Sequence, residues 1–285
     1  MPRKPFRLHL PKVTTAPVVV ASPHSGRAYD WEFMSRTVLD ADRIRSSEDA
    51  FVDLLLDGVP GLGVPLLTAE MPRAFIDLNR APSELDPAVV HDVPRGIANP
   101  RITSGLGVIP RVVAQGRAIY HGKITRAEAH DRIETVWRPY HHQLATLLAK
   151  AEAQFGRAVL IDCHSMPHEA IEGTGGKAGA PEIVLGDRFG SSADAVLVDG
   201  IEQIFADLGF RVARNAPFAG AYTTQHYGKP SQGRHAIQIE IDRALYMDEA
   251  AVRPNARFED TRLLLTDAMA RICELTRGTQ RLAAE

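Results

Sequence analysis

Two histidines that follow apolar segments are the first residues whose type and position suggest chemistry. His24 comes after the segment 17–22 (PVVVAS), and His164 comes after 157–162 (RAVLID). Segments rich in Val, Ile and Leu without alternation are typical of strands buried on both faces. Ligands bind outside the carboxyl ends of the strands in open α/β sheets. We therefore expect His24 and His164 to meet there, although 140 positions (164 − 24) separate them.

Acidic residues complete a candidate metal site. Glu48 and Asp49 lie at the start of a predicted short helix, where either one can be a third ligand or can simply interact with the helix dipole. Two imidazoles, one carboxylate and an open position are the usual set around a catalytic zinc ion. The sequence therefore predicts one divalent metal ion, with zinc as the best fit, although the same ligands accept other divalent ions.

Glu240 is the candidate general base. It lies in a third apolar segment, 235–241 (HAIQIEI), where a strand would place Gln238 and Glu240 on the face opposite the isoleucines. A carboxylate in such a strand is costly unless it is paired or bound. Zinc lowers the pKa of a bound water to about 7, and an adjacent carboxylate can then accept its proton. We expect Glu240 to have this role.

Four arginines at predicted strand ends and in a long loop suggest an anionic small-molecule substrate. Guanidinium groups bind carboxylates through two parallel hydrogen bonds. Each arginine could equally form a structural ion pair with a nearby acid such as Asp77, Glu84 or Asp86, so both interpretations stay open. The four are Arg73, Arg80, Arg111 and Arg214.

Alternating strand and helix patterns would position these residues. They predict a single α/β domain over residues 1–285, with a mixed, mostly parallel sheet flanked by helices. A capping box at Thr125 begins the longest helix, which Pro139 should kink or divide and Gly156 should end. We expect the glycine-rich segment 173–179 to form a lid. Strands are expected at 17–22, 64–69, 73–78, 157–162, 182–185, 210–214 and 235–241, and further helices at 46–57, 191–209 and 258–277.

Composition excludes several classes of protein. With 33 basic and 35 acidic residues the formal net charge is −2, which gives no electrostatic reason to expect nucleic-acid binding. No apolar run approaches the roughly 20 residues that span a bilayer. The sequence has only two cysteines and no secretory h-region, so we expect a cytoplasmic protein without disulfides. Oligomeric state stays open between a monomer and a small homo-oligomer.

Eight blocks, running in order from about residue 18 to residue 249, resemble the N-formylglutamate amidohydrolase (N-formylglutamate deformylase) family. The number and order of these blocks make the resemblance far more specific than any one of them. The blocks are SPHSGRAYD, SSEDAFVD, MPRAFIDLNRAPSELDP, GLGVIPRVV, FGRAVLIDCHSMP, VLGDRFG, VARNAPFAGAYTTQHYG and HAIQIEIDRALYMDE.

The resemblance implies hydrolysis of N-formyl-L-glutamate to L-glutamate and formate in histidine degradation. It also implies a fold similar to the zinc carboxypeptidases, whose first metal ligands form a compact His-x-x-Glu. Here Ser25, Gly26 and Arg27 follow His24 instead, and the resemblance favours Asp49 as the carboxylate ligand, with Glu48 as the alternative.

By the same resemblance, His164 is the second histidine ligand and Glu240 is the base. Asn79 and Arg80 would hold the α-carboxylate, and Arg73, Arg111 or Arg214 would bind the second carboxylate. Two rival functions remain at this point: a deacylase for N-formyl- or N-acetyl-aspartate, and a non-catalytic binder of acidic amino acids.

Overall fold

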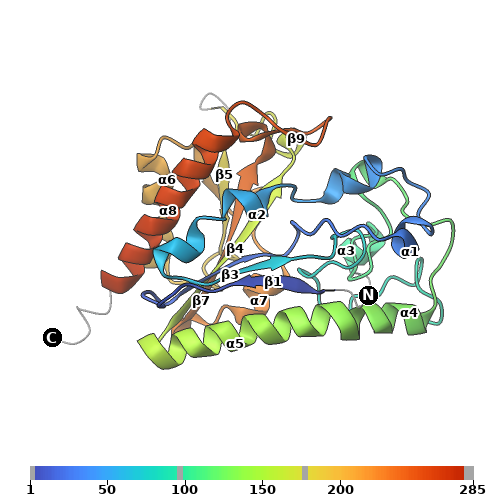
Figure 1. Ribbon diagram of the computed structural model, residues 1–285, viewed down its shortest axis with the longest axis horizontal. Coiled ribbons are helices and arrows are strands. Elements are labelled where there is room, and N and C mark those ends of the chain that lie inside the picture. The colour runs from blue at the N-terminus through green and yellow to red at the C-terminus, as the bar shows by residue number, and fades with distance from the viewer. Residues whose placement is uncertain (1–3, 95–98, 175–178, 279–285) are drawn as a thin grey trace. The chain divides into compact units, whose positions relative to one another are not determined.

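A seven-stranded sheet is the central element of the computed structural model, which describes residues 4–94, 99–174 and 179–278 (Figure 1). β2, β4 and β7 pair in parallel, whereas β5 runs antiparallel to β7 and parallel to β6. The predicted mixed, mostly parallel sheet is therefore confirmed. In spatial order the strands are β1 (Phe6–His9), β3 (Leu66–Ala69), β2 (Val18–Ser22), β4 (Ala158–Met166), β7 (Arg234–Asp242), β5 (Ile183–Gly186) and β6 (Val212–Arg214).

The chain divides into two compact units. The first comprises residues 1–7, 23–50 and 68–143, and the second comprises 8–22, 51–67 and 144–285. The prediction of a single domain stays a prediction.

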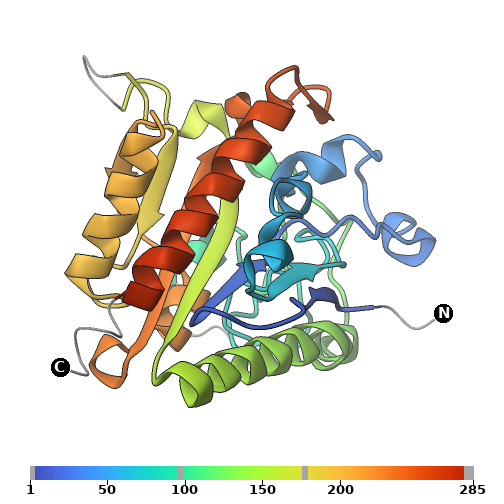
Figure 2. The same cartoon turned by 60° about the vertical axis from the view of Figure 1, so that its left-hand side comes forward.

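The second unit contains most of the sheet. Its strands β2, β4 and β7 are almost continuously buried, as their apolar sequences predict. Helices α6 (Ala195–Asp207) and α8 (Phe258–Gly278) pack against each other (Figure 2), α2 (Val52–Leu55) packs against α8, and α7 (Tyr222–Tyr227) packs on β4 and β7. Beyond the seven-stranded sheet, β8 (Met247–Asp248) and β9 (Arg253–Pro254) form a separate two-stranded pair.

The first unit consists mainly of irregular chain with short helices. These are α1 (Trp31–Met34), α3 (Pro100–Thr103) and α4 (Arg126–Arg132). Its core includes the buried guanidinium of Arg132, which lies 4.1 Å from the centroid of the Phe75 ring and donates to the Phe75 carbonyl. A cation–π contact of this kind lets a charged side chain lie among aromatic residues.

The longest predicted helix is divided, as its proline suggests. The Thr125 hydroxyl accepts a hydrogen bond from the Glu128 N–H and begins α4. A π-helical segment, Ile133–Trp137, then precedes α5 (Arg138–Phe155), in which Pro139 is the second residue. Proline has no N–H for the helix ladder, so the wider turn lies where a regular bond would be missing. Gly156, with φ +73°, follows the end of α5.

Two strand predictions need correction, and one strand was missed. Residues 73–78 form turns, and their apolar side chains are buried without being part of a sheet. β4 continues to Met166, so His164 lies within the strand and not after it. β1 was not predicted, because four residues give too short a pattern.

Two further findings concern membrane-spanning helices and the expected lid. No helix in the three described stretches is both long and apolar enough to cross a membrane. Within the expected lid, residues 175–178 lie outside the described residues.

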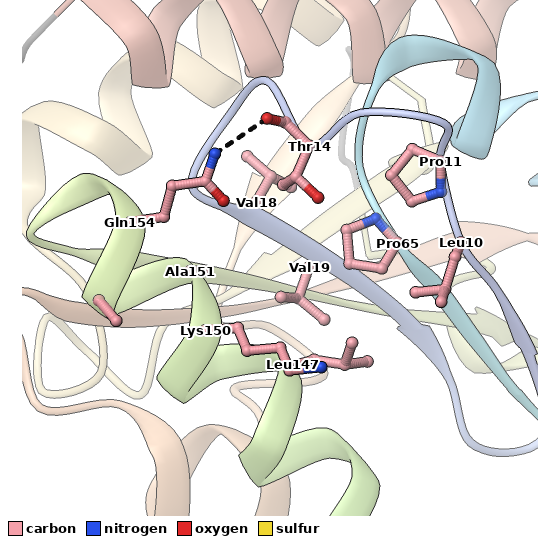
Figure 3. Close-up of a pocket in the computed structure, with 11 residues that line it drawn as sticks. Leu10, Pro11, Thr14, Val18, Val19, Pro65, Leu147, Lys150, Ala151 and Gln154 are labelled. Atoms are coloured by element: carbon pink, nitrogen blue, oxygen red, sulfur yellow. Dashed lines mark hydrogen bonds between the residues drawn. The ribbon is translucent and has the colours of Figure 1, made fainter.

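A cavity of about 510 Å³ lies between the start of β2 and α5 (Figure 3). It is mostly apolar, and the Gln154 side chain donates to the Thr14 carbonyl at its edge. Because it is lined by Val18 and Val19, it lies at the opposite end of β2 from His24.

Candidate active site

The register of the parallel strands places the predicted base beside a predicted ligand. Across β4 and β7, Asp162 pairs with Gln238, and His164 pairs with Glu240. Paired residues of neighbouring strands project from the same face of a sheet. The Glu240 side chain is buried, and its Oε1 accepts a hydrogen bond of 2.7 Å from Gln238 Nε2. His164 and Glu240 are therefore neighbours on one face.

His24 lies just beyond β2 between two carboxylates. Its Nε2 is 2.8 Å from Asp77 Oδ1, and its Nδ1 is 3.4 Å from Asp49 Oδ2. The Asp49 N–H also donates to the His24 carbonyl at 3.0 Å. The backbone turn itself thus keeps Asp49 next to His24, although 25 positions (49 − 24) separate them.

His24, Asp49 and His164 form a group that can hold a metal ion. One potential ligand atom from each lies within 4.8 Å of the others, and all three residues are buried. Imidazole nitrogen and carboxylate oxygen are ligands that zinc accepts. His164 Nε2 lies 3.1 Å from Asp162 Oδ2, so each histidine has an acid at Nε2. Such partners orient metal-binding histidines and leave Nδ1 for the ion.

Glu48 is engaged elsewhere. Arg45 donates to its two carboxylate oxygens at 3.0 and 3.1 Å, and the Tyr29 hydroxyl donates at 3.1 Å. Of the two acids that the sequence left open, the structure therefore places Asp49 beside His24 and Glu48 in a buried hydrogen-bonded group.

Asp77 connects the metal group to the predicted anion-binding residues. Besides its contact with His24, it accepts hydrogen bonds from the Asn79 N–H at 2.8 Å and from Arg73 Nε at 3.0 Å. Burial by itself would raise the pKa of Asp77, but its electrostatic interactions with His24, Arg73 and Arg80 outweigh burial and hold that pKa well below the usual range. Asp77 is therefore an ionised acceptor for the Asn79 N–H and for Arg73 Nε.

Arg80 is buried, and no carboxylate in the described part of the chain lies at hydrogen-bond distance from its guanidinium. Its Nε donates to the Leu106 carbonyl at 2.9 Å and its Nη1 to the Asn79 carbonyl at 2.8 Å, while Asp77 is 4.0 Å away. Burial is the main cause that lowers the pKa of Arg80. A guanidinium fixed by neutral carbonyls keeps its charge available for an anion.

The other three predicted arginines have acidic partners. Arg73 donates to Asp77, and Arg111 Nε donates to Asp86 at 2.9 Å. On the edge strand β6, Arg214 pairs with Asp199 and Glu202 of α6. These are the structural ion pairs that the sequence left as an alternative.

Two aromatic residues of the long helix, which the sequence analysis did not single out, support the Asn79–Arg80 segment. Trp137 Nε1 donates to the Arg80 carbonyl at 2.9 Å, and His141 Nε2 lies 2.8 Å from the Leu78 carbonyl. Their helical spacing of four residues is the signal that they share one face.

Comparison with known proteins gives concordant results. The sequence profile of the N-formylglutamate amidohydrolase family matches residues 16–247. An N-formylglutamate deformylase of Pseudomonas aeruginosa is 32% identical over 238 residues, covering 82% of this chain and 84% of that protein. One from Pseudomonas putida is 30% identical over 236 residues, covering 82% of each.

Solved structures agree at the level of the fold. The crystal structure of an N-formylglutamate amidohydrolase from Ralstonia eutropha JMP134 superposes with a TM-score of 0.90 at 36% identity, over 96% of this chain and 99% of that one. A gene product of Agrobacterium tumefaciens, 15% identical with a TM-score of 0.66 over 96% of each chain, shares the fold alone.

Proposed function

Because the chain belongs to the N-formylglutamate amidohydrolase family, we propose that it hydrolyses N-formyl-L-glutamate to L-glutamate and formate. One observation carries the proposal. A buried His–Asp–His group includes the strand residue His164, whose register partner is the buried Glu240. Burial of a carboxylate is costly, so a buried acid beside a candidate metal ligand points to a chemical role at this position.

The metal ligands in this proposal are His24, Asp49 and His164, and the metal is one zinc ion. When bound, zinc would lower the pKa of a water molecule and polarise the formyl carbonyl. Asp77 and Asp162 hold the two imidazoles through their Nε2 atoms. The ligand rings therefore need little reorganisation to bind the ion.

Glu240 is the general base in this proposal. Its carboxylate accepts a proton from the attacking water and returns it to the glutamate nitrogen as the C–N bond breaks. The hydrogen bond from Gln238 orients the carboxylate. The position of Glu240 within a strand fixes its backbone and makes its placement more precise than it would be in a loop.

Arg80 and Asn79 bind the α-carboxylate of the substrate. Arg80 supplies a buried charge, and Asp77 fixes the Asn79 backbone. The substrate is a small dianion.

The free, buried cysteines Cys163 and Cys273 suit the reducing cytoplasm that we propose as the location.

The test is the Glu240→Gln variant with zinc loaded. Removal of the base should lower kcat by about 10²- to 10⁴-fold, while zinc content measured by atomic spectroscopy stays at that of the wild type. Glu169→Gln, which changes an exposed acid after β4, is the matched control and should keep full activity. Full activity in Glu240→Gln would refute the assignment of the base. Faster turnover of N-formyl-L-aspartate than of N-formyl-L-glutamate by the wild type would refute the substrate.

A further inference from the structure

Arg101, in the short helix α3, is a positive charge that neither the sequence analysis nor the comparisons assign. The Asn99 side chain accepts a hydrogen bond of 2.9 Å from the Arg101 N–H and so begins the helix. The Arg101 side chain is partly buried. Within residues 4–94, 99–174 and 179–278, no carboxylate forms an ion pair with its guanidinium, in contrast to Arg73 and Arg111.

Two hydrogen bonds to the backbone of Leu106 attach the Arg101 segment to the Arg80 side chain. The Leu106 N–H donates to the Arg101 carbonyl at 2.8 Å, and the Leu106 carbonyl accepts from Arg80 Nε at 2.9 Å. Arg111 holds the same segment from the other side, since its Nη2 donates to the Thr103 carbonyl at 3.1 Å. The position of Arg101 relative to Arg80 is therefore set by a few bonds within one unit of the chain.

The charges around Arg80 do not balance. Burial lowers the pKa of Arg80, and the positive charges of Arg73 and Arg101 lower it further against the attraction of Asp77. Asp77 is already engaged by His24, the Asn79 N–H and Arg73. Glu84 also attracts Arg80, and burial raises the pKa of Glu84. An anion bound at Arg80 and Arg101 would relieve the repulsion between them.

We propose that Arg101 determines specificity by binding the side-chain carboxylate of an N-acyl dicarboxylic amino acid whose α-carboxylate is bound by Arg80. This inference rests on the proposed function, since a substrate with two carboxylates needs two cations. It assigns the second carboxylate to an arginine that pairs with no carboxylate among the described residues, in place of Arg73, Arg111 and Arg214, whose charges are compensated.

The experiment compares N-formyl-L-glutamate with N-formyl-L-glutamine, which has the same shape and no side-chain charge. Arg101→Gln should lower kcat/KM for formylglutamate by roughly 10- to 100-fold, mainly through KM, because a charge-assisted bond is lost. Turnover of formylglutamine should change little, so the preference for glutamate falls by the same factor. Arg101→Lys should recover part of that preference. Arg126→Gln, an exposed arginine at the start of α4, is the control and should keep the wild-type preference.

An unchanged preference in Arg101→Gln, or equal losses on both substrates, would overturn the inference and leave the proposed function intact. Absence of formylglutamate turnover by zinc-loaded wild type would instead refute the proposed function. In that case a binding experiment decides the inference separately. It measures how much more L-glutamate raises Tm than L-glutamine does. Loss of this difference in Arg101→Gln supports the role of Arg101, and persistence of the difference refutes that role. If circular dichroism shows that Arg101→Gln is unfolded, Arg101→Met, which also removes the charge, is measured in the same comparisons and decides between these outcomes.

Discussion

At the scale of single residues, the proposed metal chemistry depends on two aspartates, Asp77 and Asp162, that orient the imidazole rings of His24 and His164. His24 and His164 stand out in the sequence because each follows an apolar segment. Asp77 does not stand out, because the segment around it has the composition of a strand and folds as turns. Residue type and spacing left Glu48 and Asp49 open, and only the resemblance favoured Asp49, because the contact between the Asp49 N–H and the His24 carbonyl joins residues far apart in the sequence.

Asp77→Asn should weaken zinc binding without unfolding the protein. The substitution removes the negative charge at His24 Nε2 while it keeps the shape of the side chain, and loss of such a partner typically costs 10- to 100-fold in metal affinity. Competition with a chromogenic chelator measures the effect directly.

Asp86→Asn is the matched control for this substitution. Asp86 is equally buried in the same unit and accepts a hydrogen bond from Arg111 Nε, but it contacts no histidine. Both variants should lose some stability, and only Asp77→Asn should lose affinity for zinc. Equal zinc affinities in the two variants would show that Asp77 has a structural role only.

At the scale of elements, the apolar segments predicted most of the sheet and little of the first unit. Buried strands are recognisable because both of their faces are apolar, as in β2 and β4. The irregular chain of the first unit buries similar residues, such as Phe75 and Ile76, through turns whose hydrogen bonds reach distant partners. The Asp77 N–H, for example, donates to the Val108 carbonyl. No local pattern specifies such bonds.

Gly26 illustrates a turn that depends on close packing. A Cβ at this position would stand 2.1 Å from the Met71 carbonyl oxygen, which is backbone and cannot rotate away. Gly26→Ala should therefore destabilise the protein by about 1–3 kcal/mol and weaken zinc binding, because His24 lies two residues earlier. Chemical denaturation and chelator competition measure the two effects. Gly122→Ala, where a Cβ would meet nothing within 4 Å, should be close to neutral. A Gly26→Ala protein as stable as this control would contradict the packing argument.

At the scale of the whole molecule, metal binding at the buried group of His24, Asp49 and His164 would make the stability of the fold depend on the concentration of the metal ion. An ion that binds the folded chain and not the unfolded chain stabilises the folded state by mass action. The three proposed ligands come from segments far apart in sequence, so we expect the unfolded chain to present no comparable site.

Removal of zinc should therefore lower Tm, and its return should restore Tm in a concentration-dependent way. At free zinc about 100 times the dissociation constant, the expected stabilisation is about 2.7 kcal/mol. Scanning calorimetry at several zinc concentrations measures it. Asp49→Asn, which alters a proposed ligand, should show a much smaller shift. A Tm that does not respond to zinc in the wild type would contradict metal binding at this group.

The register of β4 against β7 restricts how relatives of this protein can differ in length. Side chains alternate between faces, so one residue gained or lost within either strand before His164 or Glu240 would turn one of them away from the other. We therefore expect insertions and deletions to be tolerated in the connections between strands and not within these two stretches. The spacing from Ala158 to His164 and from Arg234 to Glu240 is held constant by geometry, whatever residues fill it.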